Sequence, residues 1–246
     1  MTELEIAGVA TAFLAAGIVK GITGMGLPTV SIALLGLFMS TGAAATLLVV
    51  PLLVTNVMQC VGPHWRSLAL RLWPMWVCIL LGAWANPLPR VTEGGAVVQL
   101  ALGIVLMVYA AWSLLQLRLA LRCSLPVLLV VAAATGYATG MLAAATGVFV
   151  IPMLVLLQAL RLDRDEMVQA LGLSFTVCTV ALAATVGWND VARTALSPAG
   201  WAALLAACAG TLAGARVRGR LDADAFRRWL FGVLGAVGAA MVAKAL

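Results

Sequence analysis

Long apolar runs separated by short polar joints follow one another along the whole chain. A membrane-crossing helix needs about 20 mainly apolar residues, and several of these runs approach that length. Hydropathy read together with glycine and proline breakers predicts about ten hydrophobic helical elements, some short or broken. They cover residues 6–19, 26–39, 43–61, 72–87 and 97–115 in the first half, and 126–145, 148–160, 167–188, 201–217 and 229–241 in the second.

The fifteen Lys and Arg residues divide unevenly between the joints. Lys20 falls within a span. Of the other residues, eleven lie in one set of joints, and the set on the opposite side of the membrane holds only Arg90, Arg193 and Lys244. Short cytoplasmic loops accumulate positive residues. If the first two elements of each half together return the chain to its starting side, this asymmetry predicts that both termini are periplasmic. Whether those elements span fully or re-enter stays open. The eleven residues of the cytoplasmic set are Arg66, Arg71, Arg118, Arg122, Arg161, Arg164, Arg216, Arg218, Arg220, Arg227 and Arg228.

This topology gives the two halves of the chain opposite orientations. Residues 1–122 form the first repeat of the predicted transmembrane domain, and residues 123–246 form the second, inverted repeat. Residues 17–26 also align without gaps on residues 136–145, at an offset of 119. The predicted fold is therefore an all-α polytopic membrane protein of two inverted-topology repeats. Such repeats are typical of secondary transporters, whose substrate site lies near the midplane where interrupted helices meet.

The composition excludes an ordinary soluble surface, because 64% of the residues are hydrophobic and only 10% are charged. The lipid bilayer is therefore the expected surroundings. The net charge of +6 does not predict a nucleic-acid partner, since a basic patch needs a solvated face. The five cysteines are scattered singly, which predicts neither a disulfide framework nor a metal site, and no cofactor is expected.

Two stretches rich in small residues predict helix breaks, residues 21–28 and the equivalent stretch 140–152. A helix that begins at such a break points unpaired N–H groups and a positive dipole end at a ligand, which favours an anion. Close helix packing through small residues is the alternative. The candidate substrate-binding residues here are Gly21, Thr23, Gly24, Gly26, Pro28, Gly140, Thr146, Gly147 and Pro152.

Lys20 is the only basic residue within a predicted span, where a charge costs about 2.5–3.5 kcal/mol on insertion scales. It is either a cationic anchor for a substrate anion or a lysine that snorkels to the interface. None of the nine acidic residues falls deep in a span. Cation pores and carboxylate proton relays need such groups, so the charge pattern favours an anionic substrate.

Two of the predicted helices carry polar stripes at helical spacing. Ligand contact and interhelical hydrogen bonding explain such stripes equally well. The first stripe contains Thr55, Asn56 and Gln59 after Pro51, and the second contains Gln169, Gly172, Thr176 and Thr179. Thr55, Asn56, Gln59, Gln169 and Thr176 are added to Lys20 and the residues of the breaks as candidate substrate contacts.

The segments KGITGMGLPTVSIALL, VVPLLVTNVMQ, GYATGMLAAATGVFVIPMLVLLQAL and QALGLSFTV resemble the sulfite exporter TauE/SafE family of membrane permeases. The resemblance covers nearly the whole chain. It implies passage of sulfite, thiosulfate, a sulfonate such as sulfoacetate, or a related organic anion across the bacterial inner membrane, in either direction. Residues 143–147 read Ala-Ala-Ala-Thr-Gly where many members have a run of glycines.

The chain is thus predicted to be a multi-pass secondary transporter of a small anion, either an exporter or an importer. An enzyme would need a Ser–His pair, two aspartates or a metal-ligand cluster at membrane depth, and no such set is present in the sequence. The remaining alternative is a non-transporting assembly or scaffold protein, which would leave the breaks dispensable and Lys20 optional. The substrate, the transport direction, the coupling ion and assembly as a homodimer stay open.

Overall fold

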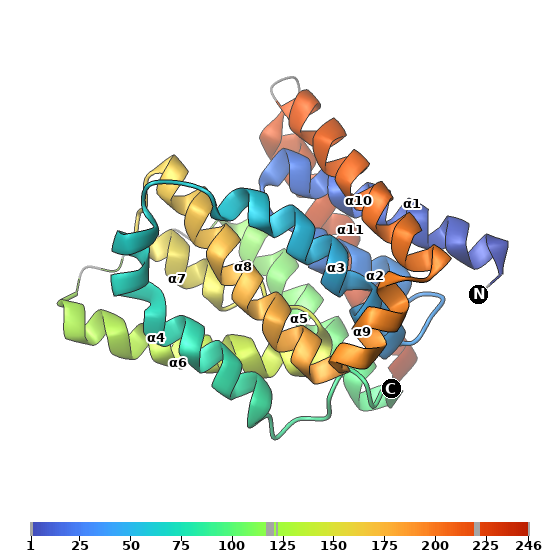
Figure 1. The fold of residues 1–246 in the computed structure, drawn as a ribbon, viewed down its shortest axis with the longest axis horizontal. Coiled ribbons are helices and arrows are strands. Elements are labelled where there is room, and N and C mark those ends of the chain that lie inside the picture. Colours follow the sequence, from blue (N-terminus) through green and yellow to red (C-terminus); the bar gives the residue numbers. More distant parts are fainter. Residues whose placement is uncertain (1, 117–120, 122, 219–221, 246) are drawn as a thin grey trace.

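A computed structural model describes residues 2–116, 121, 123–218 and 222–245 of the chain. These described residues form eleven helices and no strand, and eight of the helices are long and apolar enough to cross a membrane (Figure 1). The helices are α1 (Glu3–Thr23), α2 (Leu27–Leu35), α3 (Thr41–Cys60), α4 (Trp65–Trp84), α5 (Gly95–Leu115), α6 (Leu125–Thr146), α7 (Met153–Ala159), α8 (Arg164–Val186), α9 (Trp188–Ala195), α10 (Pro198–Val217) and α11 (Ala223–Ala245).

The all-helical class is confirmed, but the number of elements and several boundaries differ from the prediction. The polar helix α9 was missed, because Asp190 and Arg193 give this segment the hydropathy of a joint. Helix α4 begins at Trp65 rather than at residue 72. Arg66 and Arg71 lower the hydropathy of its first turns, yet both side chains are exposed on the outside of the helix. Of the arginines in the charge argument, Arg118, Arg122 and Arg220 lie outside the described residues.

Helices α2 and α7 are too short to cross a membrane, with 9 and 7 residues respectively. At 1.5 Å per residue they rise only about 14 and 11 Å. Helix α2 folds back along α1, so that Gly26 lies against Val19 near one end and Gly8 lies against the ring of Phe38 near the other. In each half a long helix is therefore followed by a half-length helix rather than by a second full span.

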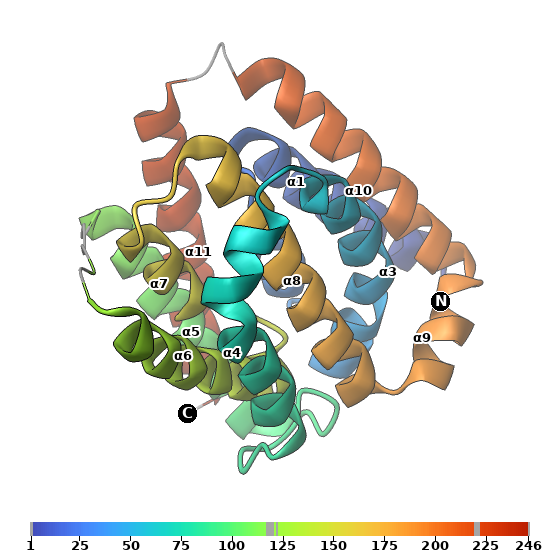
Figure 2. The ribbon, with the colours of Figure 1, turned by 60° about the vertical axis from the view of Figure 1, so that its left-hand side comes forward.

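The long helices associate in four pairs, each of which joins a helix from residues 1–122 to one from residues 123–246. Helix α1 packs along α10, α4 along α6, α3 along α8, and α5 along α11 (Figures 1 and 2). The first two pairs are parallel: Gly17 faces Gly210 and Gly21 faces Gly214 in one, while Gly136 faces Met75 in the other.

Glycines bring the paired backbones into direct contact. A Cβ added at Gly21 would collide with the carbonyl of Thr211, and one added at Gly140 would collide with the carbonyl of Ile79. The space that a side chain would occupy is thus filled by the neighbouring helix. Both candidate residues contact a helix here, as the packing alternative predicts.

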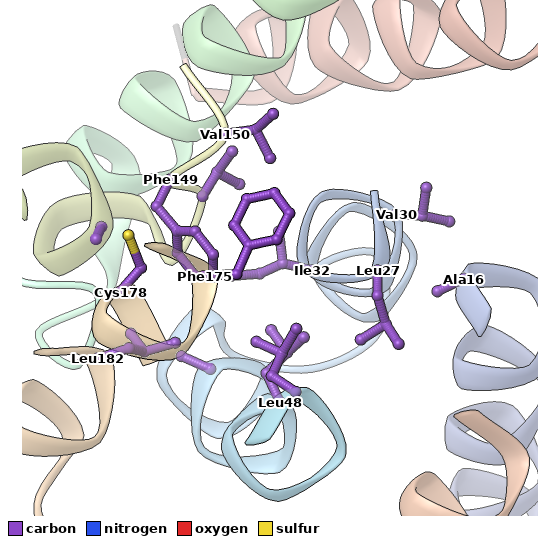
Figure 3. Close-up of a cluster of buried hydrophobic side chains, with 14 of the residues drawn as sticks. Ala16, Leu27, Val30, Ile32, Leu48, Phe149, Val150, Phe175, Cys178 and Leu182 are labelled. Carbon is purple, nitrogen blue, oxygen red and sulfur yellow. The ribbon is translucent and has the colours of Figure 1, made fainter. Parts of the chain in front are cut away.

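The buried apolar core lies where the two half-length helices and their preceding breaks converge. Figure 3 shows Ile32 of α2 beside Phe149 and Val150 of the segment before α7, with Leu48 of α3 below them. The rings of Phe149 and Phe175 pack with centroids 5.8 Å apart. The segments before and within the two short helices are therefore held at the centre of the bundle by apolar packing from α3 and α8.

The glycine contacts predict that the effect of a Gly→Ala substitution on stability depends strongly on its position. Gly136→Ala should destabilise the protein by about 1–3 kcal/mol, because the methyl group overpacks against Met75 of α4. Gly232→Ala is the matched control, since a Cβ there meets nothing within 4 Å and alanine favours a helix. Thermal unfolding of the purified protein in detergent should show a lower melting temperature for Gly136→Ala alone. Equal melting temperatures for the two variants would contradict the packing.

Candidate anion site

The first break is closed by a threonine and two glycines. Helix α1 ends at Thr23, and Gly24 and Gly26 adopt left-handed φ angles of 82° and 97° that favour glycine. The hydroxyl of Thr23 donates to the carbonyl of Val19 at 2.9 Å and accepts from the N–H of Met25 at 3.2 Å. Pro28 then lies in the first turn of α2, where its missing N–H costs no helical hydrogen bond.

The second break repeats this arrangement. Helix α6 ends at Thr146, and Gly147 has a φ of 72°. The hydroxyl of Thr146 donates to the carbonyl of Leu142 at 2.7 Å and accepts from the N–H of Val148 at 3.1 Å. Pro152 stands immediately before α7. The cap at Gly147 is therefore built like the cap at Gly24: a threonine precedes each glycine and accepts from the N–H two residues further on.

Lys20 lies one turn before the first break and points into the bundle. Its side chain is only 3% exposed, so it does not snorkel to an interface. The ammonium donates to Oγ1 of Thr55 at 3.0 Å and to Oδ1 of Asn56. The polar stripe of α3 therefore faces Lys20, which sequence spacing alone left undecided.

A chain of hydrogen bonds continues from Lys20 into the second half. With its oxygen facing Lys20, Asn56 donates from Nδ2 to Oγ1 of Thr179 at 3.5 Å, and Thr179 donates to the carbonyl of Phe175 at 2.6 Å. Thr55 likewise donates to the carbonyl of Pro51 at 2.7 Å. Thr179, which was noted in the second stripe but not chosen as a substrate contact, thus connects α8 to the cluster.

The ammonium of Lys20 has only uncharged hydrogen-bond partners. Within the described ranges, the ionic contacts join His64 to Glu166 and Arg227 to Asp224, so no carboxylate pairs with Lys20. An ammonium has three N–H donors, and Thr55 and Asn56 occupy two of them. A buried ammonium without a counter-charge is costly, and a bound anion would relieve that cost.

The sequence matches the family model of the sulfite exporter TauE/SafE over residues 9–241, nearly the whole chain. The chain belongs to the sulfite exporter TauE/SafE family. No curated protein and no solved structure matches the sequence. Together with its eight long apolar helices, membership of TauE/SafE makes this chain a multi-pass membrane transport protein.

The other candidate residues of this TauE/SafE protein hold α3 and α8 together. Gln169 donates to the carbonyls of Cys60 and Gly62 at 2.9 Å and accepts from the N–H of His64 at 2.9 Å. Its carboxamide thus clamps the turn between α3 and α4. Thr176 donates to the carbonyl of Gly172 at 2.8 Å, and its hydroxyl lies 3.3 Å from Sγ of Cys60.

Gln59 connects the polar stripe of α3 to the first break. Its Nε2 donates to the carbonyl of Gly24 at 3.1 Å, while its Oε1 is buried and has no partner in the described part of the chain. A cavity of about 780 Å³ adjoins the break and is lined by Thr23 and Gly26, but not by Lys20. The structure therefore brings Lys20, Thr55, Asn56 and Gln59 together at the first break of this TauE/SafE protein.

A double-mutant cycle tests whether Asn56 compensates the charge of Lys20. Asn56→Leu keeps the branched shape of the side chain but leaves the ammonium with one partner, so we expect a loss of about 3 kcal/mol in stability. Adding Lys20→Met removes the stranded charge and should restore part of that loss. The readout is the melting temperature of the two single variants and the double variant in detergent. Strictly additive effects would contradict the coupling.

Proposed function

We propose that this TauE/SafE protein is a secondary transporter whose anionic substrate binds the ammonium of Lys20. The observation that carries the proposal is a buried cation with one free donor and only neutral partners, set one turn before a helix break. A small sulfur anion such as sulfite, thiosulfate or a sulfonate like sulfoacetate supplies the missing charge and accepts from the free N–H. The family assignment supports this substrate class.

Residues 1–122 and 123–246 form two inverted repeats in this proposal. The proposal makes α1 equivalent to α6, α3 to α8, α4 to α10, and α5 to α11. Exchanging the halves then turns the α1–α10 pair into the α6–α4 pair and leaves the α3–α8 and α5–α11 pairs as they are. All four pairs occur in the observed packing. The left-handed glycines after α1 and α6, each preceded by a capping threonine, support the same correspondence. Helices α2 and α7 then become equivalent re-entrant helices that meet at the centre.

The first break lies near the cytoplasmic face of the bacterial inner membrane in this orientation. Nε of Arg218, in the arginine-rich joint after α10, donates to the carbonyl of Ile22 at 2.6 Å and so marks the level of the break. Both termini are periplasmic in this orientation. The route between Lys20 and the cytoplasm is therefore short.

The hydrogen-bond chain from Lys20 through Asn56 to Thr179 ties the two halves together. An anion at the free N–H changes the charge balance at this contact between the halves. The substrate can then bias the relative motion of the halves, because a ligand shifts the equilibrium between two conformations by the difference in its affinity for them. Proton coupling through a buried carboxylate is not part of this mechanism.

The topology can be tested with a membrane-impermeant maleimide. Cys123 is exposed in the joint between α5 and α6, which we place in the cytoplasm. Asn189 is an exposed residue in the first turn of α9, which we place in the periplasm. An introduced Asn189→Cys should be labelled in intact spheroplasts, whereas Cys123 should be labelled only after permeabilisation. Labelling of both positions from the same side would exclude the inverted arrangement.

Transport in proteoliposomes tests the role of Lys20. Lys20→Met should weaken substrate affinity about tenfold or more, because a charge-assisted hydrogen bond contributes about 1.5–3 kcal/mol. Lys20→Arg should rescue only part of the loss, since a planar fork replaces a compact point donor. The matched control is Lys244→Met at the exposed end of α11.

The assay should compare sulfite, thiosulfate, sulfoacetate and simple carboxylates as radiolabelled or chemically detected solutes. Lys244→Met is expected to transport with wild-type affinity. If Lys20→Met also retains wild-type affinity for every solute transported, Lys20 does not bind the substrate. If the wild-type protein transports none of these solutes, the proposed substrate class is wrong.

A further inference from the structure

The joint between α4 and α5, residues 85–94, contacts the second break, and we call this segment the strap. Residues 90, 92 and 93 are exposed, whereas Val91 between them is 0% exposed. The N–H of Val91 donates to the carbonyl of Ala144 in α6 at 2.8 Å, and its carbonyl accepts from the hydroxyl of Thr41 in α3 at 3.0 Å. One apolar residue of a surface joint is therefore fixed between two membrane helices.

The contact with Val91 closes the second break. The carbonyl of Ala144 lies in the last turn of α6, where helical carbonyls have no partner within the helix, and Val91 supplies one. All of residues 143–150 are buried. At the first break, in contrast, Thr23 and Gly24 are only half-buried, and Thr23 lines the cavity of about 780 Å³. The two breaks thus have similar caps but different access from outside.

The other side of the strap faces a second cavity. This cavity has a volume of about 610 Å³ and is lined by Gly42 and Thr46 of α3, by Thr92 of the strap and by residues of α9 and α10. A Cβ added at Gly42 would lie 3.1 Å from Cα of Thr92, so the strap packs directly on the backbone of α3. Neighbouring residues of the strap face the cavity and the second break, and the strap therefore separates the two.

The strap combines a stiff segment with a flexible end. Oδ1 of Asn86 accepts from the N–H of Leu88 at 3.1 Å, and its Nδ2 donates to the carbonyl of Leu88 at 3.0 Å. Prolines on both sides of Leu88 fix their own φ angles. At the other end, Gly94 and Gly95 have φ angles of 65° and 86°, and a Cβ added at either would meet nothing within 4 Å among the described residues. Two unconfined glycines beside a stiff segment are suited to act as a hinge.

We propose that the strap is the outer gate of the transporter. Val91 seals the second break in the present conformation, and the strap turns about Gly94 and Gly95 to release it when the protein opens to the periplasm. Two hydrogen bonds and one apolar side chain hold the gate, so it can open without unfolding a helix. The proposal rests on the transport function and the orientation given above.

The gate can be tested by thiol labelling in nanodiscs, which needs neither a substrate nor an assigned orientation. The reporter is Ala45→Cys, because Ala45 is 0% exposed and its Cβ lies 3.8 Å from the position of a Cβ added at Gly147 in the second break. A charged methanethiosulfonate reagent is added, and peptide mass spectrometry measures the label at position 45 separately from the natural cysteines.

Thr41→Val should raise the labelling rate of the reporter about fivefold or more. It nearly keeps the shape of the side chain but leaves the carbonyl of Val91 unpaired in the closed state, whereas water satisfies that carbonyl in the open state. Thr46→Val is the matched control, because the hydroxyl of Thr46 donates to the carbonyl of Gly42 within α3. It should leave the labelling rate unchanged. Equal rates in the two variants would overturn the proposal.

A reversible cross-link tests whether transport needs the gate to open. The close approach of Gly42 to Thr92 suits a disulfide in the double variant Gly42→Cys, Thr92→Cys. After oxidation in proteoliposomes the double variant should lose transport and should recover it with dithiothreitol, although the cross-link raises its melting temperature. Each single variant should transport under both conditions.

The two experiments separate failure of the gate from failure of the transport function. Undiminished transport by the fully cross-linked protein would show that the strap does not gate the pathway. If the wild-type protein transports none of the sulfur anions, the proposed function is wrong, and the labelling rates alone then decide whether the strap opens.

Discussion

Inside a bundle surrounded by lipid, every backbone N–H and C=O needs a partner within the protein, and this requirement governs the two helix breaks. Each break is capped in the same way: the N–H of Gly24 donates to the carbonyl of Lys20 at 2.7 Å, and that of Gly147 donates to the carbonyl of Ala143 at 2.9 Å. The preceding threonine satisfies the N–H two residues further on. These bonds let the chain turn from α1 into α2 and from α6 into α7 without unpaired N–H groups at the two glycines.

The same cap places the charge of the protein's one buried lysine. Because Lys20 supplies the carbonyl that closes the first cap, its side chain leaves the helix one turn before the break and reaches α3. The equivalent position of the second cap is Ala143, which has no charge to offer. The two caps therefore have similar backbones, whereas their electrostatics differ.

Magnitudes decide which of the two candidate sources of anion affinity is larger. A helix N-terminus contributes about 0.3–1 kcal/mol at an exposed site and up to about 2 in a partly buried one. Here Pro28 removes one of the free N–H groups at the start of α2, and α7 has only 7 residues. A charge-assisted hydrogen bond from an ammonium contributes about 1.5–3 kcal/mol. Lys20 is thus the stronger attraction for an anion, and the helix ends add a smaller one.

The sequence by itself determined the all-helical membrane class, the positions of most long helices, both breaks and the family, because apolar run length, glycine, proline and charge act locally along the chain. It missed α9 and the start of α4, where polar residues on an exposed face hid a helix from hydropathy. Only the tertiary structure decided that Gly21 and Gly140 contact helices, that Lys20 meets Asn56, and that Gln169 clamps a turn. Such contacts join residues far apart in the chain, and side-chain direction in three dimensions leaves no trace in the local pattern of residues. The edge-to-face contact of Tyr109 and Phe231 has the same origin, since α5 and α11 are far apart in the chain and their rings meet only after the helices pack.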